Sequence, residues 1–363
     1  MGTALGWQSG VVPGTAVTLQ RDGSSDTALH ATSDSLGVIR FPSALTGTYS
    51  ISALRVVDST ERRRLPAGYT DVDALGSGGR IAVDTPSAVT GLTLPVSHRG
   101  SLVVSEYWFP LTLVEPGPYP YGGFLELYNN SDTTVYLDGL TFGNRNQLTS
   151  EGSAYNNCDR NMLTDSTGLW TEDLFRFPGS GHDHPVAPSG AVVLATDAVD
   201  HRVVNDSATD LSGADFEFIG PSDVDNPAVP NMINLVAHQT PLGHGWFPQV
   251  DATPFVALPL DPDTLRSQVV FTFNAKYYLV PRAAVIGLSL LEFVDSRYPE
   301  CWPVLPPVFD AGPVILPYAD SYWPSFKRKV LRYLPDGRAV LQNTRTSAND
   351  FEFTFPRTPG SVP

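Results

Sequence analysis

Short, strand-sized runs separated by clusters of turn-forming residues constrain the fold of this chain more than any other sequence feature. Residues 14–20, 38–41 and 47–57 form alternating or apolar runs, with Gly, Asp, Ser and Pro filling the gaps between them. Such runs are too short for the helices of a bundle, and their spacing is typical of β-sandwiches. Only 17% of the 363 residues are charged, while 31 are glycine and 32 are proline, which favours strands joined by many turns. We therefore predict an all-β fold.

The first of two predicted domains spans residues 1–98. A Pro-Gly leads into a strand at residues 12–19, D-x-x-G and an aromatic residue follow within 33–41, and G-T-Y-x-I stands at 47–51. A closing GLTLPV occupies residues 91–96. This order resembles the carboxypeptidase-regulatory-like family, a transthyretin-type β-sandwich. The resemblance implies a non-catalytic module of secreted and surface proteins.

The second predicted domain spans residues 99–363. A strand ends on Ser105-Glu106, an E-L-Y-N-x-S block occupies 126–131, a D-G-L follows at 138–140, and P-x-G precedes a hydrophobic strand at 188–193. These blocks resemble the lamin-tail domain, an immunoglobulin-like sandwich, which implies long loops and insertions in a domain of this size. The same likeness places Glu106 and Glu126 at structural strand positions.

Three further segments identify a more specific relative. Residues 210–216, 225–231 and 327–351 resemble domain-of-unknown-function family 4876, and the likeness extends from Ser101 onward. This family implies a surface protein of Gram-negative bacteria, often lipid-anchored, with no established activity. No lipid-attachment cysteine stands near the start of the sequence, so the likeness does not predict an anchor here.

The charge balance excludes nucleic acid as a partner, whereas the cellular compartment is left open. The 23 basic and 38 acidic residues give a net charge of −15, which repels nucleic acid because binding requires cations that neutralise phosphates. No apolar run approaches the roughly 20 residues that span a bilayer. The opening MGTALGWQSG is not a secretory leader, so we expect either a cytosolic protein or a mature extracellular form without its leader. The composition favours the extracellular form.

Two pairs of side chains are candidate metal ligands. His182 and His184 are two residues apart, so in a strand their imidazoles point to the same side and can share zinc or copper. The alternative is an exposed turn with polar histidines. Asp223 and Asp225, like Asp71 and Asp73, can supply oxygen ligands to calcium, although neither pair matches an EF-hand loop. The default is an acidic surface loop and no cofactor.

Motifs for catalysis are absent from the sequence. It contains no G-x-S-x-G, S-x-x-K, H-E-x-x-H, P-loop or dinucleotide-binding motif. Glu106 and Glu126 raise the idea of a glycosidase pair, but such a pair needs a defined separation across a cleft. We therefore expect a protein that is not an enzyme.

Aromatic residues in Pro- and Gly-rich loops, and one basic cluster, are candidate interface residues. Rigid aromatics either anchor loops in a core or contact a partner. The basic cluster within residues 326–333 either protects an edge strand or docks an acidic patch on a neighbouring copy. The candidates are Trp108, Tyr121, Trp246, Trp323, Lys327, Arg328 and Lys329.

The sequence leaves two questions open: whether the two cysteines are bonded, and where the last alternating run pairs. Cys158 and Cys301 either form one long-range disulfide in an oxidising compartment or remain two buried thiols. The alternating run at residues 350–356 either pairs within its own domain or is donated as a strand to another copy.

We therefore expect a non-catalytic, extracellular structural protein of the cell surface, such as a component of a surface layer, an appendage or an adhesion complex. Its expected partners are other copies of itself or other surface proteins. The alternative is a surface accessory protein that captures a ligand for an outer-membrane importer. A metal-dependent hydrolase would need the histidine pair to acquire further ligands.

Overall fold

The computed structural model of the chain describes residues 1–22, 24, 26–85, 87–108, 122–146, 166–206, 208–220, 225–236, 252–270, 275–286, 293–295, 305–306, 308–316 and 324–361. Strands dominate this part of the chain, and the α-helices within it have four residues each: α1 (Gly2–Leu5), α2 (Ser59–Arg62) and α3 (Ser347–Asp350). The predicted all-β class is confirmed. No helix of the described residues is long and apolar enough to cross a membrane.

The N-terminal region forms one antiparallel sheet in the order β2-β1-β3-β4-β5. Its strands are β1 (Ala16–Arg21), β2 (Leu29–Thr32), β3 (Gly47–Val56), β4 (Val72–Val83) and β5 (Val96–His98). Alternate residues of β1 and β3, among them Val17, Leu19 and Ile51, are buried in a common core, as the period of two along a strand requires. The other wall of this core contains Ile39, Phe41 and Leu94, which come from the connections between strands.

The predicted strand at residues 38–41 does not form. Asp34 accepts the backbone N–H groups of Leu36 and Val38 on one carboxylate oxygen, and its own N–H donates to the Val38 carbonyl. These local bonds replace a strand ladder, as Asp side chains in turns commonly do. Ile39 and Phe41 still pack on the sheet, so their apolar character reflects burial rather than strand pairing.

Ten further strands build two larger sheets that share a core. The first is ordered β14-β13-β7-β6-β21-β24 and the second β15-β11-β9-β16. Leu125 and Leu127 of the first pack in the same buried cluster as Phe142 and Phe175 of the second. The strands are β6 (Leu102–Trp108), β7 (Phe124–Asn129), β9 (Thr141–Asn146), β11 (Asp173–Arg176), β13 (Ala191–Ala195), β14 (Phe216–Glu217), β15 (Ile233–Val236), β16 (Ala252–Ala257), β21 (Ser325–Arg328) and β24 (Phe351–Thr354).

Smaller elements extend these sheets and connect them. They form one three-stranded sheet, in the order β10-β18-β17, and the strand pairs β12-β8, β19-β20 and β22-β23. Their strands are β8 (Val135–Tyr136), β10 (Gly168–Thr171), β12 (Pro185–Val186), β17 (Ser267–Val270), β18 (Ala275–Pro281), β19 (Phe293–Asp295), β20 (Val314–Leu316), β22 (Val330–Tyr333) and β23 (Ala339–Leu341). The 3-10 turns are η1 (Ala67–Tyr69), η3 (His201–Val203), η4 (Pro262–Thr264) and η5 (Arg282–Ala284).

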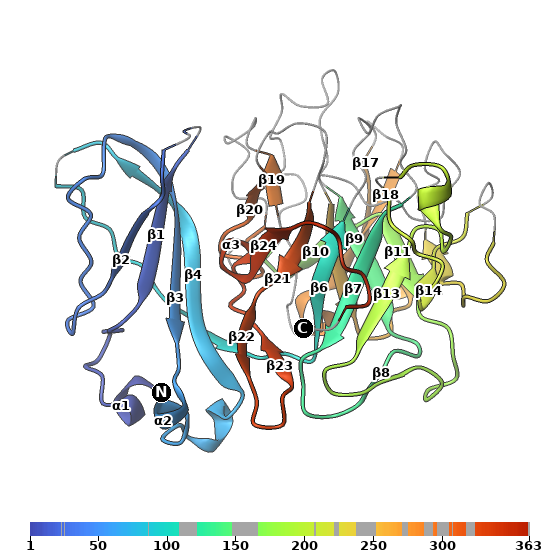
Figure 1. Cartoon of the computed structure of the whole chain (residues 1–363), viewed down its shortest axis with the longest axis horizontal. Helices are drawn as coiled ribbons and strands as arrows, with labels where there is room; N and C mark the ends of the chain where they lie inside the picture. The colour runs from blue at the N-terminus through green and yellow to red at the C-terminus, as the bar shows by residue number, and fades with distance from the viewer. Residues whose placement is uncertain are drawn as a thin grey trace.

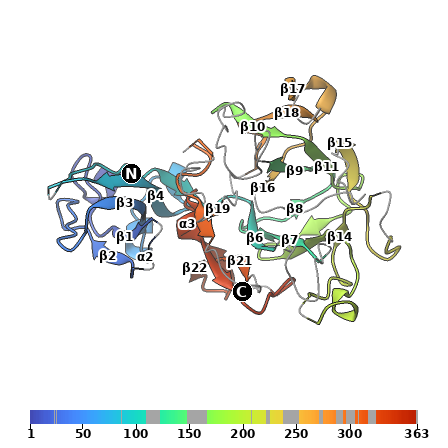
Figure 2. The ribbon, with the colours of Figure 1, turned by 90° about the horizontal axis from the view of Figure 1, so that it is seen from above.

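The two regions meet along β4, which lies beside the β22-β23 pair and α3 (Figure 1). Seen from above, α3 and β22 stand between the N-terminal sheet and the larger sheets (Figure 2). The elements that contact the N-terminal sheet therefore come from the far end of the sequence.

The alternating run at residues 350–356 pairs within its own chain. β24 is antiparallel to β21, with Lys327 opposite Glu352 and Arg328 opposite Phe351. It forms the end strand of the six-stranded sheet, so the intramolecular alternative of the two considered above is the one that this structure contains.

We predict that the shared core carries much of the stability of the second region. Phe142 has no exposed surface, so Phe142→Ala should lower the free energy of unfolding by about 3–5 kcal/mol because it leaves a cavity. Val203→Ala, at a side chain that is 82% exposed, is the matched control and should change it by less than about 0.5 kcal/mol. Urea unfolding followed by fluorescence measures both. Equal effects of the two substitutions would contradict this assignment of the core.

Candidate functional site

The two candidate histidine ligands lie in a loop before β12, against different aromatic rings. The His182 ring meets Tyr136 edge-on with 4.5 Å between centroids, and the His184 ring meets Phe216 in the same way at 4.9 Å. Among the residues that the structure describes, no group of three or more His, Cys, Asp or Glu side chains has a metal-binding arrangement. The zinc or copper site stays a prediction.

Asp138 organises that histidine loop. Its carboxylate accepts backbone N–H groups of Gly181, Asp183 and His184 at 2.9–3.2 Å. Burial alone would raise the pKa of Asp138, but these hydrogen bonds outweigh it and lower the pKa to about 2. The loop is therefore held by an ionised carboxylate that the D-G-L motif supplies.

The acidic candidates for calcium have protein partners where they are described. Asp225 accepts a hydrogen bond from Asn231 Nδ2 at 2.7 Å, and Asp71 pairs with His98 Nδ1 at 2.9 Å. Asp223 lies outside the described residues, so the calcium prediction is not resolved by these contacts.

The basic cluster is used inside the chain. Arg328 is buried, donates to the Val104 carbonyl and pairs with Asp350 at 3.4 Å. Lys327 pairs with Glu106 at 3.4 Å, and Lys329 Nζ donates to the Asn349 carbonyl. Since β21 lies between β6 and β24, Lys327 and Arg328 stand inside the sheet rather than at its edge, and Lys329 follows directly after the strand.

The aromatic candidates divide into one buried residue and three that cannot be placed. Trp108 is 4% exposed and packs against Phe124. Tyr121, Trp246 and Trp323 lie outside the described residues. Cys158 and Cys301 also lie outside them, so the predicted disulfide is untested.

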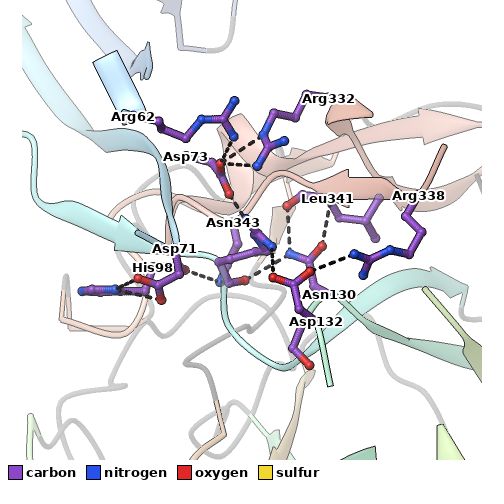
Figure 3. Close-up of polar contacts among 12 residues, drawn as sticks. Arg62, Asp71, Asp73, His98, Asn130, Asp132, Arg332, Arg338, Leu341 and Asn343 are labelled. Carbon is purple, nitrogen blue, oxygen red and sulfur yellow. Dashed lines mark hydrogen bonds and ion pairs between the residues drawn. The ribbon is translucent and has the colours of Figure 1, made fainter. Parts of the chain in front are cut away.

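A polar cluster that the sequence did not reveal fixes the N-terminal sheet to the second region (Figure 3). Its centre is Asp73 of β4, a carboxylate that is 3% exposed. One oxygen contacts Arg62 Nη1 at 2.8 Å and Arg332 Nη2 at 2.7 Å, and the other accepts from Arg99 Nε at 2.9 Å. The three arginines come from α2, the connection between the regions, and β22. One carboxylate therefore joins both regions and their connection.

A second layer of contacts surrounds Asn130 (Figure 3). Its amide donates to the Leu341 carbonyl at 3.0 Å and accepts the Leu341 N–H at 2.8 Å, which closes a two-bond ring with β23. Asp132 then pairs with Arg99 and Arg338, both at 3.1 Å. Asn130 of the E-L-Y-N-x-S block and Asp132 directly after it thus contact the β22-β23 pair and the turn between its strands.

Glycines allow β4 to approach the second region closely. A Cβ at Gly76 would lie 2.3 Å from the Thr344 Cβ, and one at Gly78 would lie 2.8 Å from the Thr346 Cγ2. Asn349 Nδ2 donates at 2.8 Å to the carbonyl of Ala53 in β3. Steric contact and hydrogen bonding therefore reinforce the ion pairs around Asp73.

A pair of buried glutamates forms the other polar centre. The register of β6 against β7 shifts between Val104 and Glu106, which marks a β-bulge at Ser105. The extra residue reverses the alternation of side chains, so that Glu106 stands opposite Glu126 on the face of the six-stranded sheet that points away from the shared core. We call this the outer face. Both carboxylates have no exposed surface.

Residues near position 360 complete this centre. Thr358 N and Oγ1 donate to Glu106 at 2.9 and 2.7 Å, and Gly360 N donates to Glu126 at 2.7 Å. Ser105 Oγ donates to Glu126 at 2.7 Å. Burial, with a smaller effect from the nearby Glu106 charge, raises the pKa of Glu126 to about 7, although these donors act against it.

The sequence signals for these centres differ in strength. Glu106 and Glu126 stand in recognisable motifs. The bulge that turns both side chains to the same face contains no glycine or proline from which the sequence could have predicted it. Thr358-Pro359-Gly360 has the composition of a tight turn, a signal that could have been noticed. The sequence marked Asp73 only as one of a pair of candidate calcium ligands. Nothing local indicates its arginine partners, which are 11 to 259 residues away.

We predict that Asp73 is a main contributor to the attachment of the two regions. Asp73→Asn should lower the free energy of unfolding by about 3 kcal/mol, because three arginines lose their common partner. Asp71→Asn removes a pair whose side chains are 52% and 47% exposed and should cost less than about 1 kcal/mol. Chemical unfolding measures both variants. A loss for Asp73→Asn no larger than that for Asp71→Asn would contradict the assignment.

We also predict a pH dependence that comes from Glu126. Its pKa of about 7 exceeds the ordinary 4.5, so the unfolded chain loses this proton first as the pH rises. The free energy of unfolding should therefore fall between about pH 4.5 and 7. Glu126→Gln should reduce the loss of stability between about pH 5 and 8 by up to roughly 3 kcal/mol. Thermal unfolding at both pH values tests this, and an unchanged pH dependence in the variant would contradict it.

Comparison with known proteins connects the second region to a family. The model of DUF4876, a protein family of unknown function, matches residues 187–358, whereas the sequence motifs predicted the likeness from Ser101. A solved structure of a DUF4876 family protein from Bacteroides thetaiotaomicron VPI-5482 is similar, with 20% sequence identity, coverage of 98% of this chain and 96% of that chain, and a TM-score of 0.55. A likeness at this identity shows the fold alone. No curated protein matches the chain. The predicted resemblance is confirmed: residues 187–358 match the DUF4876 model, and a solved protein of that family has a similar fold.

Proposed function

We propose that this chain is a non-catalytic structural protein of the outer cell surface, which works by assembly with copies of itself or with other surface proteins. The observation that carries the proposal is the Asp73 cluster, which joins both regions and their connection through one buried carboxylate. An assembly component benefits from such a joint because fixed orientation keeps its contact surfaces in register from copy to copy. The surface location rests on the resemblance drawn from the sequence.

The buried carboxylates support a structural role over a chemical one. A catalytic acid or base must reach a substrate proton, directly or through one water. Glu106 and Glu126 instead receive hydrogen bonds from Thr358, Gly360 and serine hydroxyl groups of the chain itself. Asp73 is likewise paired with arginines, so all three buried carboxylates have partners within the chain.

The test combines location with assembly in cells that produce the protein. We expect protease added to intact cells to remove it, and electron microscopy of the native material to show an ordered polymer or a complex with a surface partner. Asp73→Asn should disrupt that order while the purified variant keeps its β-rich circular dichroism, because the joint is loosened and the sheets remain. Asp71→Asn is the control and should assemble normally.

Two results would overturn the proposal. Protection of the protein from protease on intact cells, together with its digestion after lysis, would place it inside the cell. A lone monomer with a bound small ligand in the native material would favour capture of a ligand for an importer.

A further inference from the structure

Residues 355–361, which we call the strap, cross the outer face of the six-stranded sheet. The segment leaves β24 at the end of that sheet and passes in front of β6 and β7 (Figure 1). Gly360 reaches Val193 of β13, since a Cβ at Gly360 would lie 4.0 Å from the Val193 Cγ2. The strap therefore spans several strands to which it adds no ladder pairing.

A tight turn shapes the strap. Ser361 N donates to the Thr358 carbonyl at 3.0 Å, and Gly360 has a φ of 77°. Pro359 in the second position and a glycine with positive φ in the third are the features of a type II turn. The turn brings the N–H groups of Thr358 and Gly360 to the two glutamates, so the strap is organised for this contact by its own sequence.

Hydrogen bonds to Glu106 and Glu126, which together we call the floor, hold the turn in place. Glu106 accepts two bonds from Thr358, and Glu126 accepts one from Gly360. Both carboxylates are fully buried. Removal of the strap would leave them without these donors, and buried carboxylates that lose donors are costly. The floor therefore favours any segment that supplies the same donors.

The arginine of the strap adds a second contact. The Arg357 guanidinium carbon lies 4.0 Å from the Trp108 ring centroid, and Arg357 Nε donates to Thr209 Oγ1 at 2.9 Å. A cation over a tryptophan face is a favourable and selective contact. The floor thus recognises the order Arg-Thr-Pro-Gly through the arginine, the threonine and the turn.

The link between β24 and these anchors is weakly packed. Phe355 is 66% exposed and Pro356 is also exposed. The link between β24 and the anchors therefore adds little buried apolar contact that would tie their position to that of β24.

We propose that the Glu106–Glu126 floor, with Trp108 and Lys327, is a docking site for the Arg357–Gly360 segment, and that in the assembled protein its occupant is the strap of a second copy. A strap from another copy carries the same Arg357, Thr358 and Gly360 groups, so exchange would link two copies while these anchor contacts are made in each. This inference rests on the proposed assembly function and gives it a molecular contact.

The first experiment asks whether the floor binds the strap from outside. The full chain carrying Arg357→Ala and Thr358→Val is the acceptor, since its own strap lacks two anchors. A fluorescent peptide with the sequence of residues 355–363 is the probe, measured by anisotropy. We expect saturable binding to the acceptor, at least tenfold weaker binding to the unmodified chain, whose floor is occupied, and at least tenfold weaker binding of the peptide carrying T358V.

Matched controls make the result decisive. Adding Glu106→Gln to the acceptor should weaken peptide binding at least tenfold, whereas adding Asp71→Asn, far from the floor, should leave it unchanged. Circular dichroism and a cooperative melt confirm that each variant is folded. If the double substitution does not fold, Thr358→Val alone serves as a milder acceptor. A folded acceptor that ignores the peptide, or binds it equally with Glu106→Gln, overturns the docking site.

The second experiment tests the second copy as occupant. A donor chain carrying Glu106→Gln and Glu126→Gln keeps its strap but has a weakened floor. Mixed with the acceptor, it should form a one-to-one complex in native mass spectrometry, which neither variant forms alone. A mixture that stays monomeric while the acceptor binds the peptide overturns the exchange between copies. Because both experiments use purified protein, they are independent of the location test, and the two proposals can fail separately.

Discussion

The buried carboxylate of Asp73 is the interaction on which the arrangement of the molecule depends. A charge removed from water is tolerated only when strong partners surround it, and here Arg62, Arg99 and Arg332 are those partners. Each arginine comes from a different segment, so satisfying this one charge fixes where all three lie. The close approach of Gly76 to Thr344 belongs to the same arrangement.

The second constraint is the bulge at Ser105. A strand presents alternate residues to opposite faces, and one extra residue reverses that alternation from Glu106 onward. Without it, Glu106 would point into the apolar core shared with Phe142. With it, two carboxylates share the outer face and require donors, which the strap provides through Thr358 and Gly360. A local irregularity in β6 thereby determines where a segment some 250 residues later must lie.

Sequence patterns predicted features that depend on near neighbours. The Gly- and Asp-rich clusters marked turns, the alternating run at 350–356 became β24, and the E-L-Y-N block became β7 and its turn. The run at 38–41 shows the limit of this reasoning, since Asp34 captured its backbone groups. Likewise, the basic residues of β21 suggested an exposed edge, but Arg328 is buried against Asp350, a partner that strand periodicity cannot identify.

By itself, the sequence determined the all-β class, the positions of most turns, and a family likeness carried by short motifs. These follow from local physics, because backbone preference and side-chain alternation act over a few residues. The tertiary structure alone decided that Asp73 is a joint and that Glu106 and Glu126 form one floor beneath the strap. Such groupings depend on contacts between segments that are far apart in the sequence. The free energy of a buried carboxylate depends on the donors around it, and only the completed fold decides which donors these are.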